Sequence, residues 1–200
     1  MAQAQFTRER WSALCKRLGC DAAIEKFGQL TAAYAEPARA YHTAQHIDEC
    51  LTLLDMVASL LQSPDEVELA IWLHDVVYDP QAKDNEARSA VLAAQWFVQL
   101  TVDRQEILRR RILATQRHLP CPDDSDGQAL LDIDLAILAA APVRFAEYAK
   151  QVRKEYSFVP WPLYWYKRRQ FMRQMAQRAQ LYFHPTLAPR LEPMARRNLA

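Results

Sequence analysis

The chain has 200 residues, of which half are hydrophobic and 24% are charged, so its size and composition are typical of one globular domain. Its net charge of +1 gives no electrostatic reason to expect binding to nucleic acid or to a membrane. Only three glycines occur, too few for the Gly-rich phosphate loops of Walker-type or dinucleotide-binding proteins.

The cysteines and the N-terminal segment predict a cytoplasmic protein. No C-x-x-C pair occurs among Cys15, Cys20, Cys50 and Cys121, so we expect reduced thiols. The segment MAQAQFTRERW lacks the apolar run of a signal peptide. No other segment approaches the roughly 18 uninterrupted apolar residues of a transmembrane helix.

Helical periodicity runs through the chain and no convincing alternating strand interrupts it, so we expect an all-α fold. The first three expected helices cover residues 3–18, 22–34 and 43–62. The next helix has the clearest start, because Ser63 suits an N-cap, Pro64 suits the first helical position and Glu66 completes a capping box. Pro80 marks its end.

Further helices are expected over residues 84–100, 103–117, 125–140, 142–156, 162–182 and 188–199. Asp84 and Asp103 are the expected N-caps of the first two. Short connections and the lack of a long linker predict one helical bundle, a single domain over residues 1–200. We expect its core at about residues 36–140, with the N-terminal and C-terminal helices packed on that core.

Histidines are scarce, and several of them stand beside other polar residues in otherwise apolar segments. His42 and His46 lie four residues apart in YHTAQHIDEC, and His74 precedes Asp75 in AIWLHDVVYD. His74 and Asp75 are expected in the last turns of a helix whose inner face is apolar. A fifth polar position, His118, ends the segment RRRILATQRH.

Two carboxylates, Asp132 and Asp134, are embedded in the apolar run ALLDIDLAIL. A carboxylate that faces a core costs several kcal/mol unless it is paired or bound to a metal. Helical geometry separates these positions by about 200°, so at most one faces the core directly. The other is expected to cap, to pair or to face solvent.

Imidazoles and carboxylates together form a good site for a divalent cation. Four such ligands leave two positions of an octahedral ion for water or for a phosphate oxygen, as metal-assisted hydrolysis requires. The candidate ligand set contains two histidines and two aspartates.

The order of these residues resembles a known signature. His46, the pair His74 and Asp75, and Asp134 resemble the H…HD…D signature of the HD superfamily, which consists of all-α metal-dependent phosphohydrolases. YHTAQH is similar to the Y-H-N-x-x-H segment of cyclic-nucleotide phosphodiesterases, and HDVVYD to the H-D-x-x-E-D segment of ppGpp hydrolases. Over about residues 6–199 the chain resembles one bacterial branch of predicted metal-dependent HD phosphohydrolases.

The resemblance implies a central metal site with His46, His74, Asp75 and Asp134 as ligands. They would hold one divalent ion (Mn, Mg, Zn, Co, Ni or Fe), with a second ion as an option. His42 matches the phosphodiesterase histidine that protonates the leaving oxygen.

The sequence departs from the ppGpp-hydrolase pattern at Tyr78, where that pattern has a glutamate. Asp79 keeps the following acidic position. The carboxylate that would activate water is therefore expected to be Asp79 or Glu86.

Basic residues and His118 are the candidates for contact with substrate. Arg39 lies one helical turn before His42, and the other candidates are Arg153, Lys167 and Arg168, whose alternative is a solvated helix face. For His118 the alternatives are a ligand of a second metal, a phosphate contact or a helix cap. The aromatic cluster at 161–166 fits packing better than stacking on a nucleobase.

These features favour an enzyme that hydrolyses a phosphate ester or anhydride of a small molecule, with a nucleotide as the expected substrate. The alternative is a non-catalytic sensor module that contains a metal and binds a nucleotide. A di-iron oxygenase on the same scaffold normally needs more histidines than this chain has. The expected partner is a small phosphate-containing molecule, without nucleic acid or membrane, and a homodimer is an open option.

Overall fold

The computed structural model describes residues 4–200, and it is helical without any β-strand over that range, in agreement with the predicted all-α class. The expected helix start at residue 3 lies outside the described residues. The α-helices are α1 (Arg8–Arg17), α2 (Phe27–Tyr34), α3 (Ala44–Val57), α4 (Pro64–Leu73), α5 (Asn85–Trp96), α6 (Val102–Thr115), α7 (Ser125–Asp134), α8 (Pro142–Glu155), α9 (Trp161–Gln177) and α10 (Ala188–Leu199). None of these helices is long and apolar enough to cross a membrane.

Several of the expected helices are shorter than the periodicity predicts. α4 ends at Leu73 and not near Pro80, α5 ends at Trp96 and not at residue 100, and α9 ends at Gln177 and not at residue 182. In three other helices a 3-10 segment takes up part of the expected length. These segments are η1 (Asp21–Lys26) before α2, η2 (Ala58–Leu60) after α3, and η3 (Leu135–Ala139) after α7. The break after α7 falls directly after Asp134. It matters for function, since it places that carboxylate at a helix end.

α4 starts at the residue that the sequence predicts, but the predicted capping hydrogen bonds are not formed. Ser63 is the N-cap and Pro64 the first helical residue, as expected, but the Ser63 side chain makes no capping hydrogen bond. Glu66 forms an ion pair of 2.7 Å with Arg104 of α6 instead of closing a capping box. The predicted capping box is therefore wrong, because a cross-helix ion pair competes for the glutamate.

Of the expected caps of α5 and α6, the position of Asp84 is confirmed and that of Asp103 is wrong. Asp84 occupies the N-cap of α5 without a side-chain hydrogen bond. Asp103 lies inside the first turn of α6, and Thr101 is the N-cap, whose hydroxyl accepts from the Arg104 amide. The acidic side chain in the first turn still has a favourable interaction with the helix dipole.

The larger apolar cluster attaches the N-terminal helices to the central ones. Trp72 of α4 is fully buried at its centre, with Trp11 of α1 packed edge to face at a ring distance of 5.5 Å. The Tyr34 hydroxyl of α2 donates to the Trp72 carbonyl over 2.9 Å. Large buried aromatic side chains contribute most of the packing energy of such clusters.

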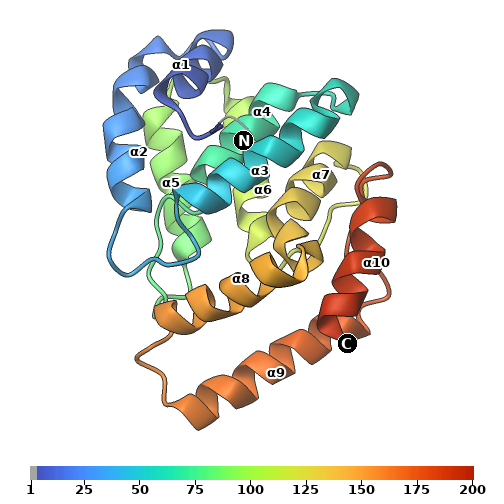
Figure 1. Cartoon of the computed structure of the whole chain (residues 1–200). Coiled ribbons are helices and arrows are strands. Elements are labelled where there is room, and N and C mark those ends of the chain that lie inside the picture. Colours follow the sequence, from blue (N-terminus) through green and yellow to red (C-terminus); the bar gives the residue numbers. More distant parts are fainter. Residues whose placement is uncertain (1–3) are drawn as a thin grey trace.

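A second, smaller apolar cluster joins the C-terminal helices to η3 and to the segment before α3. It contains Tyr41, Leu138, Tyr148, Leu181 and Tyr182. Figure 1 shows α9 along the lower edge of the molecule, with α8 between it and the central helices, and α10 along the right side. Met175 is the one buried residue of α9, so this helix is held mainly at its C-terminal end.

Carboxylates on the helices stabilise the non-helical connections by accepting hydrogen bonds from their backbone amides. Asp132 of α7 accepts from the amides of Phe183 and His184, at distances between 2.7 and 2.9 Å. Burial raises the pKa of Asp132 to about 7, although the hydrogen bonds from these amides lower it. Of the two carboxylates in the D-I-D segment, Asp132 is thus the one that pairs with backbone amides. This is one of the outcomes that the sequence leaves open.

Replacement of Asp132 should destabilise the fold. In Asp132→Ala the amides of residues 183 and 184 lose their acceptor, so we expect the free energy of unfolding to fall by about 2 kcal/mol or more. Asp132→Asn keeps a carbonyl oxygen as acceptor and should lose less. Urea denaturation measures the difference, with the exposed Asp123→Ala as control. Equal stability of Asp132→Ala and the control would contradict this role.

Candidate metal centre

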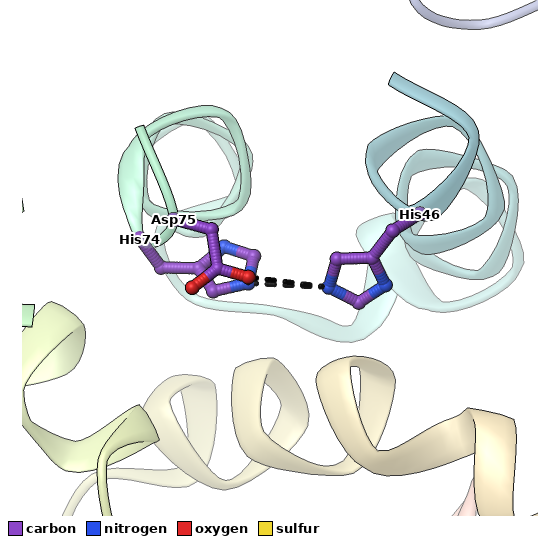
Figure 2. Close-up of side chains that lie close together, drawn as sticks. All are labelled: His46, His74 and Asp75. Carbon is purple, nitrogen blue, oxygen red and sulfur yellow. Dashed lines mark hydrogen bonds and ion pairs between the residues drawn. The ribbon is translucent and has the colours of Figure 1, made fainter. Parts of the chain in front are cut away.

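Three helix ends bring four polar side chains together. His46 lies in the first turn of α3, His74 is the C-cap of α4 and Asp75 follows it, and Asp134 is the last residue of α7. Figure 2 shows the ring of His46 facing His74 and Asp75 across the gap between their helices. Short helices that end at one point can therefore present ligands from three directions.

The ligand atoms lie at the spacing that a single ion requires. His46 Nε2 is 3.3 Å from His74 Nε2 and 3.1 Å from Asp134 Oδ1. His74 Nε2 is 3.2 Å from Asp75 Oδ2 and 3.4 Å from Asp134 Oδ1. Ligands about 2.1 Å from one ion, at octahedral or tetrahedral angles, stand about 3.0–3.4 Å apart. His46 Nε2 and Asp75 Oδ2 are farther apart, at 3.8 Å, between the spacings of neighbouring and of opposite ligands of one octahedral ion. The four side chains could therefore hold one divalent ion.

The hydrogen bonds of the two imidazoles support the same conclusion. His74 Nδ1 lies 3.0 Å from the Ile71 carbonyl, which can only accept, so Nδ1 carries the hydrogen and Nε2 keeps its lone pair. On His46, Nδ1 lies 3.2 Å from the Tyr41 hydroxyl. The two Nε2 atoms then face each other, an arrangement that needs a proton or a cation between them. Such an outer hydrogen bond is the usual way to orient a metal-binding histidine.

The electrostatics of the site favour a cation. Burial raises the pKa of Asp75 and Asp134, but the charge and hydrogen bonds of neighbouring histidines, His74 foremost, hold both below their usual range. Burial lowers the pKa of His74, yet the same two carboxylates raise it well above its usual value. Protons and a metal ion therefore compete for the same nitrogen and oxygen atoms.

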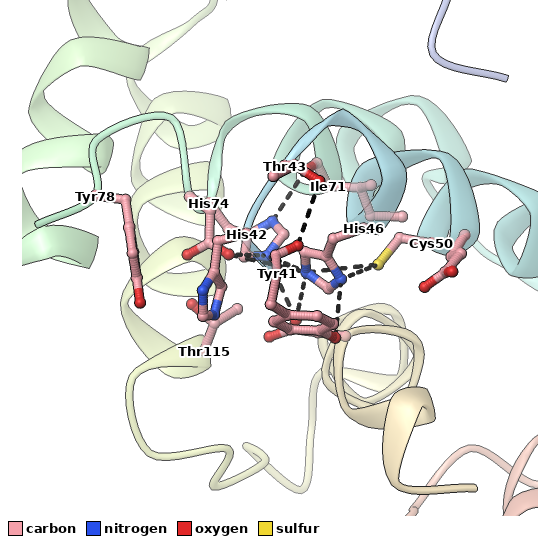
Figure 3. A network of polar contacts seen from close by, with 12 residues as sticks. Tyr41, His42, Thr43, His46, Cys50, Ile71, His74, Tyr78 and Thr115 are labelled. Atoms are coloured by element: carbon pink, nitrogen blue, oxygen red, sulfur yellow. Dashed lines mark hydrogen bonds and ion pairs between the residues drawn. The ribbon is translucent and has the colours of Figure 1, made fainter. Parts of the chain in front are cut away.

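His42 is not part of this ligand set and has its own carboxylate partner. Its Nδ1 lies 2.8 Å from Oε2 of Glu155, which also accepts from the Tyr78 hydroxyl over 2.9 Å. The Tyr78 ring is stacked on His42 with a centroid distance of 4.3 Å, and Figure 3 shows the two rings side by side. Tyr78, which replaces the glutamate of the ppGpp-hydrolase pattern, therefore covers His42 and shares its carboxylate.

Glu155 holds the whole segment that carries His42. Its Oε1 accepts from the amides of Ala40, Tyr41 and His42 at 2.8–3.0 Å. Although burial raises the pKa of Glu155, the His42 imidazole and these amides lower it to about 2. Burial in turn lowers the pKa of His42, but the charges of Asp75 and Glu155 raise it above its usual value. The pair therefore favours a protonated His42 beside an ionised Glu155.

His118 orients one of the predicted ligands. Its Nε2 lies 2.8 Å from Oδ2 of Asp134, whose Oδ1 faces the two buried histidines. The φ angle of His118 is 49°, a left-handed conformation that is costly for a residue with a Cβ. Arg178 stabilises this turn by donating to the carbonyls of Arg117 and His118. The strained backbone at His118 thus places its imidazole beside the Asp134 carboxylate.

A cavity of about 720 Å³ opens beside the metal centre. The carboxylates of Asp75 and Asp134 reach it with 13% and 12% of their side chains exposed, whereas the imidazoles of His46 and His74 are buried. The sequence-predicted site residues that line the cavity are His42, Asp75, Glu86, His118, Asp134, Lys167 and Arg168. Arg39, Asp79 and Arg153 do not line it.

Arg39 has a structural position instead of a place in the cavity. Its guanidinium donates to the carbonyls of His42, Asp75 and Val76 at 2.7–3.2 Å, and its side chain is fully buried. The expected substrate contact is not made from there. Arg39 instead connects the segment that carries His42 with the turn that carries Asp75, and so fixes the acid relative to the metal ligands.

Asp79 and Arg153 are also directed away from the cavity. The Asp79 carboxylate accepts from the Gln81 amide in the turn before α5. Arg153 donates to the Tyr156 carbonyl, and its guanidinium lies 4.7 Å from the centroid of the Tyr164 ring. Of the two carboxylates considered for activating water, only Glu86 lines the cavity.

Glu155, Tyr41 and Cys50 are site residues that the sequence analysis misses. Glu155 belongs to VRKEY, where only Arg153 drew attention, because a glutamate on a polar helix gives no sign of burial. Cys50 lies one turn after His46, with its Sγ 3.7 Å from Nδ1 of that histidine. His46, Cys50 and Asp134 form a second group that could hold an ion, and the i, i+4 spacing could have indicated it.

Metal binding tests the ligand set directly. We expect Mn²⁺ added to metal-free protein to bind with one ion per chain in calorimetry and to raise the melting temperature. Asp134→Asn should weaken binding at least a hundredfold, because a ligand charge is lost. His118→Ala should weaken it about tenfold, as loss of an orienting contact does. The exposed Asp103→Asn is the control, and equal affinity of all four proteins would exclude the site.

The comparisons with known proteins add no assignment to this geometry. No protein-family model, no curated protein and no solved structure matches the chain. The case for a metal centre therefore rests on the four convergent side chains, the tautomer of His74 fixed by the Ile71 carbonyl, and the cavity beside them.

Proposed function

We propose that this chain is a cytoplasmic metal-dependent phosphohydrolase of the HD type, which hydrolyses a phosphate ester or anhydride of a small molecule. The observation that carries the proposal is the convergence of two imidazole nitrogens and two carboxylates beside a cavity that also contains His42. The motif resemblance supports the same reaction class. A divalent ion at this centre supplies Lewis acidity toward a phosphate oxygen and toward water.

The residues around the metal centre supply the proton transfers. His42, held at Nδ1 by Glu155, offers Nε2 to the leaving oxygen and donates a proton to it. Glu86 at the cavity wall orients the attacking water and accepts its proton. Lys167 supplies positive charge at the same cavity, where phosphate oxygens need it.

The size of the cavity favours a nucleotide or a metabolite of similar size. Pockets for small ligands typically measure about 300–1,000 Å³, and this cavity falls well inside that range. Its wall contains the rings of Tyr148, Tyr156 and Tyr164, against which a flat group can pack.

A non-catalytic sensor module is the second candidate. It is favoured by Tyr78, which stands where ppGpp hydrolases have a glutamate, and by the position of Asp79 outside the cavity. In this case the metal is structural and the cavity binds a nucleotide without turnover. Loss of metal would then abolish nucleotide binding, and no hydrolysis would occur under any condition.

Turnover separates the two candidates. Protein loaded with Mn²⁺, Co²⁺ or Zn²⁺ should release phosphate from at least one member of a panel of nucleotides and small phosphoesters. Asp75→Ala should lower the rate at least a thousandfold through loss of the metal, and Glu86→Gln should lower kcat with less effect on KM. Absence of turnover with the whole panel, or an undiminished rate in Asp75→Ala, would exclude the hydrolase.

The pH dependence of kcat tests the acid. The neighbouring carboxylates raise the pKa of His42, so the protonated form persists to higher pH and the rate falls only when pH rises through that pKa. Glu155→Gln removes one negative charge, lowers the pKa of His42 and should move this decline to lower pH. Glu147→Gln, an exposed change on the same helix, should leave the profile in place. Identical profiles for both variants would exclude His42 as the acid oriented by Glu155.

A further inference from the structure

Arg168, a partly buried residue, differs from the buried Arg39 and Arg111 in having no anion or carbonyl to bind. It lies on the cavity side of α9, and its Nη2 is buried without a hydrogen-bond partner. Its guanidinium lies 4.8 Å from the ring centroid of Tyr148 and 5.3 Å from that of Phe171. Within residues 4–200 no carboxylate forms an ion pair with it. A buried donor without a partner needs an explanation, and an absent ligand is one.

The contrast with the two buried arginines, Arg39 and Arg111, shows how unusual this is. Arg39 donates to carbonyls through both of its terminal nitrogens. Arg111 has one unpartnered nitrogen, but it holds Asp124 through two others, at 2.8 and 3.2 Å. Arg168 is bonded through none of its nitrogens within the described chain. A guanidinium placed in this way is ready for an anion that enters the cavity.

The position of Arg168 separates that anion from the phosphate at the metal centre. The ring of His46 packs against Tyr41 at a centroid distance of 4.9 Å, and Tyr41 packs against Tyr148 at 4.6 Å. Arg168 lies on Tyr148, so the path of side-chain contacts from it to that ligand runs through two aromatic rings (Figure 3 shows Tyr41 beside His46). It makes no ion pair with Asp75 or Asp134. Two anions can therefore be held at the same time, at different places.

The cavity wall near Arg168 is mainly apolar and aromatic. Val152, Tyr156, Tyr164 and Phe171 contribute to it, together with the ring of Tyr148. Lys167, on the same turn of α9, adds a second positive charge. Such a wall suits a flat or apolar segment, and the volume is more than one phosphate needs.

We infer that the substrate carries a second anionic group, a phosphate or a carboxylate, and that Arg168 binds it. A flat apolar segment then joins this group to the phosphoester that is hydrolysed. The inference rests on the proposed function for the end of the substrate at the metal centre. It makes α9, which is held mainly at its C-terminal end, the element that selects bis-anionic substrates.

Non-hydrolysable probes test this selection without turnover. Calorimetry on Mn²⁺-loaded and metal-free protein would compare phenylphosphonate with benzene-1,4-diphosphonate and 4-phosphonobenzoate. The two bis-anionic probes should bind at least about tenfold more tightly, as a charge-assisted hydrogen bond predicts. The diphosphonate and the benzoate distinguish a second phosphate from a carboxylate. Equal affinity for all three probes would overturn the inference.

Matched variants assign the preference to one side chain. Arg168→Gln should remove the tenfold preference for the bis-anionic probes in the Mn²⁺-loaded protein, whereas Arg168→Lys should keep part of it. Arg169→Gln is the control, because that neighbouring side chain is exposed and lies over Trp165 outside the cavity. A preference that survives in Arg168→Gln, or that Arg169→Gln also removes, would overturn the inference.

The two proposals can fail separately. A bis-anionic preference that depends on Arg168, in a protein that hydrolyses no phosphoester, would exclude the hydrolase and leave the anion site intact. Metal-dependent hydrolysis that is indifferent to a second anionic group in the substrate, and to Arg168→Gln, would support the hydrolase and exclude the anion site. Circular dichroism and melting temperatures confirm that each variant is folded before its affinity is measured.

Discussion

The structure depends on carboxylates that accept hydrogen bonds from the backbone amides of its connections. In an all-helical chain most amides are satisfied within helices, but those of the connections need other acceptors. Glu155, Asp132, Asp126 and Glu192 provide them for segments distant in sequence. Glu155 is the most important of these, since it binds the backbone around His42 and the His42 ring at once. Removing it would release the segment that carries the proposed acid from the helix behind it.

The same use of helix ends explains why the metal centre lies where it does. His46 begins a helix, His74 ends one, and Asp134 is the last residue before the chain turns into a 3-10 segment. At a helix end the backbone can change direction without breaking hydrogen bonds inside the helix. Side chains from the ends of three helices can therefore meet at one point. The strained turn at His118 belongs to this arrangement, because its imidazole holds the outer oxygen of Asp134.

The sequence singled out residues whose type conflicts with their apolar surroundings, and the structure brings these residues together in a cluster that could hold a metal ion. A histidine or an aspartate inside an apolar run is costly without a partner, and four such residues do converge. Arg39 and Arg153 were expected in the cavity, but a cation near a motif can equally bind backbone carbonyls, and the sequence does not distinguish the two. Glu155 was not expected at all, because its burial is created by α8 packing on residues 40–42, far away along the chain.

The sequence alone determined the helical class and most helix positions, because helical periodicity is a property of short segments. It also marked the polar residues set in apolar segments, and the resemblance to the HD signature named four candidate ligands among them. Only the tertiary structure decided which of Asp132 and Asp134 faces the histidines, where the long helices break and which basic residues reach the cavity. These outcomes depend on competition between partners that are distant in sequence, as when Glu66 leaves its cap for Arg104. Arg168 is the clearest example, since its lack of a partner is visible only when every neighbour has been placed.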